Sequence, residues 1–342
     1  MGRKSSLSRS RSNLLMNFSI DEITKTWSEI ELKKYKGKYQ KSIYTNAKIK
    51  INASVIFDQN LRSVDFTFDI NKIIEKKINF KETKGIKVDI LQHQDFPNLI
   101  IICIYLKNLS FLEAYLRLLE KIIFIIYENE DQQYNFNQIS KSLLNWRKCF
   151  ENESAGGLKL EEQIGLFGEL VQLEKIINKG VSKKNSLIYW QGPENGLHDF
   201  KHSRFLVEVK TTLNDKEEIV INNIEQFNYV AFNNLYLCVV FFEFKDSGPT
   251  LTEFIKRIEK NIFYEAEDKL LFNEKLNRAG FFDFQANNYK TNFVVEKIKY
   301  FKILNDFPTI LPNNLQKGIK DVKFKISVKN LHLFEVSNEF LK

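Results

Sequence analysis

The sequence predicts a mixed α+β protein with two domains. The chain has 342 residues, of which 43% are hydrophobic, and this length suggests about two ordinary domains. Apolar residues that alternate with mostly polar ones, as in half-buried strands, dominate residues 47–90. In the second half, stretches with helical periodicity alternate with strand-like runs. We therefore expect a mixed central sheet flanked by helices, preceded by a separate α+β N-terminal domain.

Composition divides the chain into three predicted segments. A disordered basic tail covers residues 1–16, the N-terminal α+β domain covers 17–150, and a motif-bearing domain with a C-terminal extension covers 151–342. Arg3, Lys4, Arg9 and Arg11 of the tail supply four of the formal net charge of +8. The remaining positive charge permits nucleic-acid binding through a local patch but does not require it.

The N-terminal domain is predicted to pack one helix on an antiparallel sheet. Alternating residues predict half-buried strands at 47–57, 64–70 and 86–90, and residues 99–106 predict a more buried one. Residues 111–127 predict a helix with Leu112, Tyr115, Leu116 and Leu119 on one face. No catalytic constellation is visible in this domain. DNA recognition, binding of a partner subunit and structural support all remain open as its role.

The second domain is predicted from a longer series of elements. A proline-free helix spans residues 161–178 and ends near Gly180. A strand at 205–210 follows a turn-rich segment, and a short strand from 218 leads to an Asn223 cap and a helix start. The elements that follow are a buried strand at 235–242, helices through 254–258 and 265–276, and strands at 292–304 and 322–328.

The most informative residues of the chain are Asp199, Glu208 and Lys210. Strand alternation in 205–210 places Glu208 and Lys210 on the same face. A hairpin between Asp199 and this strand would bring the two carboxylates together. Paired carboxylates suit Mg²⁺, which takes oxygen ligands and keeps several waters, and a neighbouring lysine can stabilise charge on a phosphate.

A Glu-x-Lys triplet alone is weak evidence, because the chain contains several others. Those starting at Glu31, Glu75 and Glu267 lie in charged, helix-like stretches, and Glu82 lies in a polar turn, so solvated faces explain them. Glu243 ends a strand-like run but has no acid delivered by a turn before it.

Two further residues are candidates for the same site. Glu169 lies within the apolar stripe of the 161–178 helix, where a carboxylate needs a partner. A salt bridge or a snorkelling side chain would satisfy it, and so would a place in a metal site that faces the hairpin. Gln226 stands at capping-box spacing from Asn223, so capping is an adequate role, although it could also reach the site.

Several spaced motifs together resemble a bacterial family of PD-(D/E)XK motif proteins from the restriction-endonuclease-like nuclease superfamily. The resemblance covers roughly residues 155–230 and rests on Gly165-Leu-Phe-Gly-Glu-Leu170, Trp190-Gln-Gly-Pro193, His198-Asp-Phe200, Glu208-Val-Lys-Thr-Thr212 and Glu225-Gln-Phe227. It implies a restriction-endonuclease-like core with Asp199 and Glu208 as metal ligands, Lys210 as the catalytic lysine, Glu169 as the helix-borne acid and Gln226 as an accessory polar residue. One departure is that His198, not proline, directly precedes Asp199.

These residues and the resemblance predict a Mg²⁺-dependent endonuclease, with Mn²⁺ as a possible substitute, that hydrolyses DNA phosphodiester bonds and leaves a 5′-phosphate. Asp199, Glu208 and Glu169 would form the acidic metal site. The resemblance links such proteins with restriction or phage-defence gene sets, and cutting both strands favours a homodimer or a second pass. The alternative is a nucleic-acid-binding or scaffold subunit of a defence complex that keeps the fold but is inactive without a partner.

Cysteine usage and hydropathy bear on location. Cys103, Cys149 and Cys238 are odd in number, widely spaced and set among apolar or aromatic residues, as expected for reduced core thiols of a cytoplasmic protein. With four scattered histidines, no zinc ligand set is visible. The sequence shows no signal peptide and no apolar run long enough to span a membrane, so no membrane partner is expected.

Overall fold

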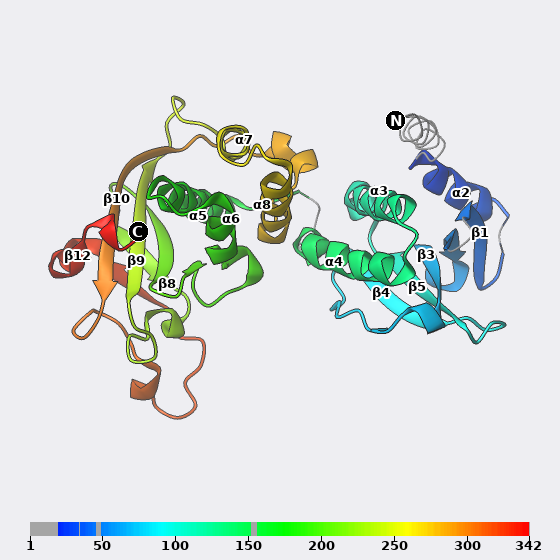
Figure 1. Ribbon diagram of the computed structural model, residues 1–342, viewed down its shortest axis with the longest axis horizontal. Coiled ribbons are helices and arrows are strands. Elements are labelled where there is room, and N and C mark those ends of the chain that lie inside the picture. The colour runs from blue at the N-terminus through cyan, green and yellow to red at the C-terminus, as the bar shows by residue number, and fades with distance from the viewer. Residues whose placement is uncertain (1–19, 34, 46–48, 152–155, 342) are drawn as a thin grey trace, which may run out of the picture. The chain divides into compact units, whose positions relative to one another are not determined.

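The computed structural model describes residues 20–33, 35–45, 49–151 and 156–341 (Figure 1). The predicted basic tail and Ala47, at the start of the first predicted strand, lie outside these ranges. The chain divides into two compact units, one up to residue 155 and one from residue 156 onward. No helix among the described residues is long and apolar enough to cross a membrane.

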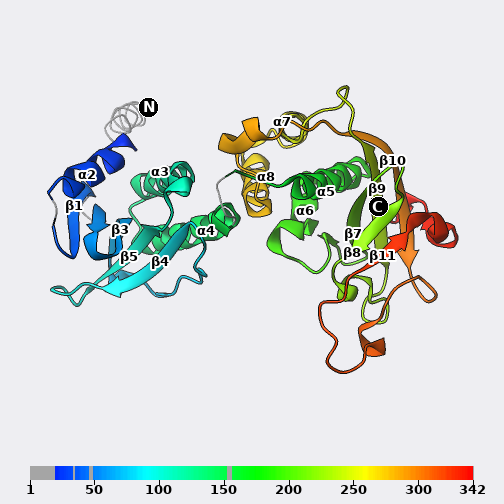
Figure 2. The same cartoon turned by 180° about the vertical axis from the view of Figure 1, so that it is seen from behind.

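The N-terminal unit contains a five-stranded sheet with the order β1-β2-β3-β5-β4, in which all neighbours are antiparallel. The strands are β1 (Lys38–Thr45), β2 (Lys50–Ile56), β3 (Leu61–Asp69), β4 (Ile86–Gln92) and β5 (Leu99–Leu106). The helices are α2 (Asp21–Glu31), α3 (Leu112–Glu128) and α4 (Gln132–Glu151). Figure 2 shows α4 behind the strands β4 and β5. The antiparallel sheet is as predicted, whereas α2, β1 and α4 were not predicted.

The two faces of this sheet differ in chemistry. Its apolar face meets the helices, because the Phe68 ring contacts Phe136 of α4 and the Tyr115 hydroxyl of α3 donates to the Ile104 carbonyl at 2.6 Å. We call the opposite side the polar face, and its buried members on β2 and β3 include Asn52, Ser54, Ser63, Asp65 and Thr67.

Two predictions for this unit are wrong in detail. The strands β2 and β3 are buried on both sides rather than half-buried, because they are interior strands whose polar side chains are buried too. In α3 the buried stripe includes Ala114, Tyr115, Leu118 and Leu119, whereas Leu112 and Leu116 are only half-buried. The stripe is rotated because α3 packs on α4 as well as on the sheet.

The C-terminal unit is built on a mixed five-stranded sheet with the order β12-β10-β9-β7-β6. Strands β7 and β9 run parallel, and every other neighbouring pair is antiparallel. The strands are β6 (Phe200–Lys201), β7 (Leu206–Leu213), β9 (Leu235–Glu243), β10 (Val294–Ile303) and β12 (Glu335–Val336), and β8 (Glu218–Ile221) pairs with β11 (Phe324–Ser327) outside it. The predicted mixed sheet is therefore confirmed.

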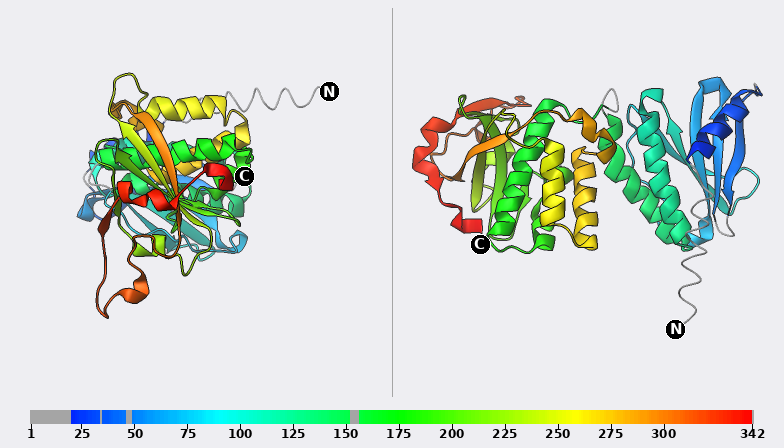
Figure 3. Two further views of the ribbon diagram at one scale, coloured as in Figure 1. Left: turned by 90° about the vertical axis from the view of Figure 1, so that its left-hand side faces the viewer. Right: turned by 90° about the horizontal axis from the view of Figure 1, so that it is seen from above.

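Helices cover one face of this sheet, and the β8–β11 pair covers the other. The helices are α5 (Leu160–Asn178), α6 (Lys183–Tyr189), α7 (Leu251–Asn261) and α8 (Ala266–Ala279). Val209, Cys238 and Val240 belong to the core on the side of α5, while Leu237 and Val239 belong to the core on the side of β8. Helix α5 lies against β7 and β9, α6 and α7 pack on α5, and α8 packs on α6. Figure 3 shows these helices on one side of the sheet. The predicted helices and strands of this unit are confirmed, except at Asn223.

Gly168 lets α5 approach β7, which carries two candidate site residues. A Cβ at Gly168 would lie 2.3 Å from Thr211 Cγ2, whereas a Cβ at Gly165 on the same helix would meet nothing within 4 Å. We expect Gly168→Ala to lower the free energy of unfolding by about 1–3 kcal/mol through overpacking. Gly165→Ala should be neutral or stabilising by up to about 1 kcal/mol, because alanine favours a helix.

Chemical denaturation of the two variants measures this difference. Adding Thr211→Ser to Gly168→Ala removes the clashing methyl group, so part of the lost stability should return. Equal stability of the two single variants would show that α5 does not depend on close contact at Gly168.

Candidate active site

The hairpin predicted before β7 is present and brings Asp199 beside Glu208. Phe200 of β6 pairs with Val207 of β7, so Asp199, one residue earlier, stands across from Glu208. The Val209 N–H donates to Asp199 Oδ2 at 2.7 Å. The two acids are therefore held at adjacent positions by the backbone of the hairpin.

Glu208 is buried and only half of its carboxylate is satisfied. Its side chain is 1% exposed, and Lys210 Nζ lies 2.5 Å from Oε1. No hydrogen-bond partner for Oε2 exists among the described residues. A buried carboxylate oxygen without a partner is costly, because it loses water and gains nothing in return. This oxygen is free to receive a cation or a donor.

Burial and mutual repulsion set the charge state of the pair of acids. Burial raises the pKa of Glu208 to about 8, and the neighbouring Asp199 charge acts in the same direction against the opposing effect of Lys210. Burial also raises the pKa of Asp199, although Lys210 and the Val209 N–H oppose the shift. For Lys210, burial lowers the pKa, but the charges of Glu208 and Asp199 outweigh it and raise the pKa overall. The lysine is therefore a cation, and it is paired with Glu208.

Glu169 reaches the same region from α5. The Trp190 indole N–H donates to Glu169 Oε2 at 2.6 Å, so this acid in the apolar stripe has a hydrogen-bonded partner. A Cβ placed on Gly192 would lie 2.2 Å from Glu169 Oε2 and 3.1 Å from Asp199 Oδ1. The two carboxylates thus face one small space beside Gly192, which no larger residue could share with them.

Gln226 also reaches the site, but not from an α-helix. The segment Ile224–Phe227 forms a single 3₁₀ turn, so the predicted helix start is wrong. The turn ends there because Phe227 enters the core against Phe307 and the next residue leaves helical conformation. Asn223 caps the turn through the Glu225 N–H, as predicted for a cap.

The side chain of Gln226 serves the site rather than the cap. Its Oε1 accepts a hydrogen bond from Lys210 Nζ at 3.3 Å, and its Nε2 donates to the Leu197 carbonyl at 3.2 Å. His198 Nε2 lies 3.0 Å from the backbone carbonyl oxygen of Gln226. Gln226 therefore bridges Lys210 to the segment that leads to Asp199.

Two residues near the site have roles that were not predicted. Trp190 was part of a quoted motif, but its indole bond to Glu169 could not be derived from spacing. Lys275 of α8 is 3% exposed, donates to the Trp190 carbonyl and lies 3.3 Å from Glu194 Oε1. It fixes the turn that carries Trp190 and Gly192. Its position between the buried Phe272 and Leu276 was the signal that could have identified it.

The other Glu-x-Lys triplet that ends a strand lacks these features. Lys245 forms salt bridges with Glu243 at 2.6 Å and Glu296 at 2.9 Å, and all three side chains are about one-third exposed or more. Solvent screens such pairs, which makes a surface role sufficient.

The residues at the hairpin offer oxygen ligands for a divalent metal ion. Over the described ranges, no three histidine, cysteine, aspartate or glutamate side chains are spaced to hold one ion together. The adjacent Asp199 and Glu208, with the unpartnered Glu208 Oε2, nevertheless form an oxygen pair of the kind that Mg²⁺ takes while keeping its waters.

One comparison with known proteins gives a match. A family model described as "Putative PD-(D/E)XK family member, (DUF4420)" matches residues 23–329, which is most of the chain. Neither the curated proteins nor the solved structures compared with the chain give a match. Members of this superfamily are nucleases that generally use divalent metals. By this match, the chain belongs to the DUF4420 family of PD-(D/E)XK proteins.

Proposed function

We propose that the protein is a metal-dependent endonuclease that hydrolyses phosphodiester bonds of DNA. The observation that carries this proposal is the buried Glu208 carboxylate, whose Oε2 has no partner among the described residues while Lys210 holds Oε1. An acid kept in this state next to Asp199 has little structural benefit. Membership of a nuclease-like family supports the same reading.

Asp199 and Glu208 would hold Mg²⁺, or Mn²⁺ in its place, and Glu169 is the third carboxylate at the site. When bound, the ion supplies an activated water and neutralises charge on the phosphate. Lys210 is the cation nearest to the two acids, so it would position the attacking water or a phosphate oxygen. Gln226 orients Lys210, and Trp190 orients Glu169.

The role of the nuclease within the cell is part of the proposal. The family resemblance favours a restriction or phage-defence system in the cytoplasm. The buried Cys103, Cys149 and Cys238 form no disulfide, which suits a reducing compartment. One site per chain favours a homodimer for cutting both strands of a duplex.

A second candidate function is a nucleic-acid-binding or scaffold subunit that becomes active only with a partner. The observation that favours it is the short Lys210–Glu208 ion pair, because a lysine engaged with an acid is less available to a phosphate. A scaffold would not bind the metal ion. A nuclease would bind it in the isolated chain, whether or not its activity needs a partner.

Cleavage of supercoiled plasmid and of single-stranded circular DNA tests the proposal. We expect wild-type protein to nick DNA with Mg²⁺ or Mn²⁺ and to be inactive with EDTA. Asp199→Asn should lose at least about 10²-fold in rate, because the oxygen ligand and its charge are changed. Asp215→Asn, at an exposed acid just beyond β7, is the matched control and should retain activity.

The results distinguish the two candidates. Metal-dependent nicking that Asp199→Asn removes supports the nuclease. An inert wild type that still binds Mn²⁺ in calorimetry supports an enzyme that needs a partner, and an inert wild type without metal binding supports the scaffold.

A further inference from the structure

The N-terminal unit contains a cavity of about 400 Å³ at the end of its sheet that leads into the β4–β5 loop. Its lining includes Lys50 and Asn52 of β2, Thr67 of β3 and the nearby Lys72, His93 and Phe96. Lys50, Asn52 and Thr67 all belong to the polar face. A volume of this size is typical of sites that enclose a small molecule.

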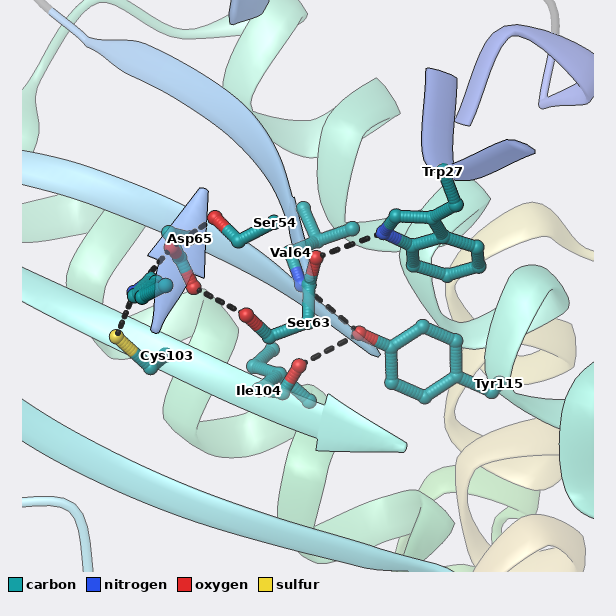
Figure 4. A network of polar contacts seen from close by, with 9 residues as sticks. Trp27, Ser54, Ser63, Val64, Asp65, Cys103, Ile104 and Tyr115 are labelled. Carbon is teal, nitrogen blue, oxygen red and sulfur yellow. Dashed lines mark hydrogen bonds and ion pairs between the residues drawn. The ribbon is translucent and has the colours of Figure 1, made fainter. Parts of the chain in front are cut away.

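The buried acid opposite Asn52 of the lining is Asp65, and Figure 4 shows its contacts. The buried Asp65 accepts hydrogen bonds from Ser54 Oγ at 2.6 Å and Ser63 Oγ at 2.9 Å. It also forms an ion pair with Lys38 Nζ at 2.7 Å. Because these partners satisfy the carboxylate, the polar face presents no uncompensated buried acid to an anionic ligand.

Asn52 has an unused acceptor in the lining. It stands directly opposite Asp65 in the register of β2 and β3, and it is 5% exposed. No partner for its Oδ1 exists among the described residues. A buried amide oxygen requires a donor, and the cavity is the place from which one can come. An exocyclic amino group of a nucleobase is such a donor.

Cations and an aromatic ring surround this acceptor. Lys50 and Lys72 are exposed, and neither forms a salt bridge over the described ranges. Phe96 is 54% exposed and lies edge-to-face with His93, at 5.0 Å between ring centroids. The Asp69 carboxylate also lines the cavity and accepts from the Asn71 N–H, so the lysines leave a small positive excess.

We infer that this cavity binds a nucleotide. The base would stack on Phe96 and donate its exocyclic amino group to Asn52, and Lys50 and Lys72 would hold the phosphate. Adenine, cytosine and guanine each carry an exocyclic amino group that can donate to the Asn52 acceptor, whereas thymine has none. The ligand is either an unpaired nucleotide of a strand or a free nucleotide. The inference uses no residue of the candidate active site, so it does not depend on the proposed nuclease function.

Binding of the full-length protein to labelled oligonucleotides tests the inference. Fluorescence anisotropy with dA12 and dT12, in EDTA to prevent cleavage, gives the affinities, and unlabelled AMP serves as competitor. Phe96→Ala should weaken dA12 binding at least about fivefold, because a stacked base is lost. Lys50→Ala/Lys72→Ala should lower the slope of log affinity against log salt by about 1.4. Lys25→Ala/Lys33→Ala is the charge-matched control, with Lys25 on α2 and Lys33 just after it. It should change neither the affinity for dA12 nor the salt dependence of binding.

The outcomes decide both the inference and the source of the ligand. We call Phe96→Ala and Lys50→Ala/Lys72→Ala the cavity variants. If AMP displaces dA12 and also binds these variants more weakly than the wild type, the ligand is a free nucleotide. Binding of dA12 that weakens in these variants without AMP competition identifies an unpaired nucleotide in a strand. The inference is overturned if the cavity variants bind dA12 and AMP as the wild type does, or if dT12 binds as tightly as dA12. Phe96 and the two lysines are exposed, so their replacement should not prevent folding.

Discussion

Lys210→Ala is expected to reduce the rate of DNA cleavage by about 10²–10³-fold, the usual effect of removing one group that stabilises charge in a transition state. Lys210 Nζ is held 2.5 Å from Glu208 Oε1 and 3.3 Å from Gln226 Oε1, so it is fixed beside both acids of the hairpin. Plasmid cleavage under single-turnover conditions measures the rate. Lys216→Ala, an exposed lysine in the turn after β7, is the control for charge and should cleave normally.

The same change should also affect stability, and this second readout separates two roles of the lysine. Without Lys210 the buried Glu208 loses its counter-ion, so we expect a loss of about 3–5 kcal/mol at a pH where Glu208 is charged. In a Glu208→Gln background the loss should largely disappear, because no buried charge remains to be paired. A folded Lys210→Ala protein that cleaves at the wild-type rate would show that Lys210 is only the counter-ion of Glu208.

The elements of the C-terminal unit were predictable because each carries a local signal. The helix at 160–178 has a 3.6-residue apolar period without proline, and β7 alternates between its two faces. The pairing of Asp199 with Glu208 followed from turn-forming residues ahead of a strand. Such signals are short-range, so a single sequence contains them.

Contacts that depend on tertiary packing could not be predicted. The 3₁₀ turn after Asn223 has the same cap as an α-helix, and only the packing of Phe227 against Phe307 stops it. Trp190 bonds Glu169 across 21 positions of sequence, and Lys275 reaches the Trp190 carbonyl across 85. In the N-terminal unit, β1 and α4 contain many polar residues, so their periodicity was too weak to identify them.

The residues of the site could be predicted from the sequence, whereas their burial could not. The five residues Glu169, Asp199, Glu208, Lys210 and Gln226 are joined through shared contacts, from Trp190 and Gly192 on one side to the Leu197 carbonyl on the other. The sequence could not show that Glu208 is buried with one oxygen unpartnered. That burial makes the site sensitive to pH.

Glu208 is expected to make the metal-free protein less stable as pH rises from about 4.5 to about 8. Burial raises its pKa from 4.5 to about 8, so the unfolded chain releases the proton at a lower pH than the folded protein does. Over this window the folded state binds more protons, and stability therefore falls as pH rises. A shift of this size corresponds to about 4–5 kcal/mol in total.

Urea denaturation of wild type and Glu208→Gln between pH 4.5 and 8.5 measures the effect. As pH rises, the free energy of unfolding of Glu208→Gln should increase by about 4–5 kcal/mol relative to that of the wild type. Glu161→Gln, at an exposed acid in the first turn of α5, is the control and should show the pH dependence of the wild type. Parallel curves for wild type and Glu208→Gln would mean that Glu208 is already charged at low pH. A divalent ion must displace the same proton, so Mg²⁺ affinity should rise up to about pH 8. Calorimetry in buffers of different ionisation enthalpy would then detect proton release in the wild type and not in Glu208→Gln.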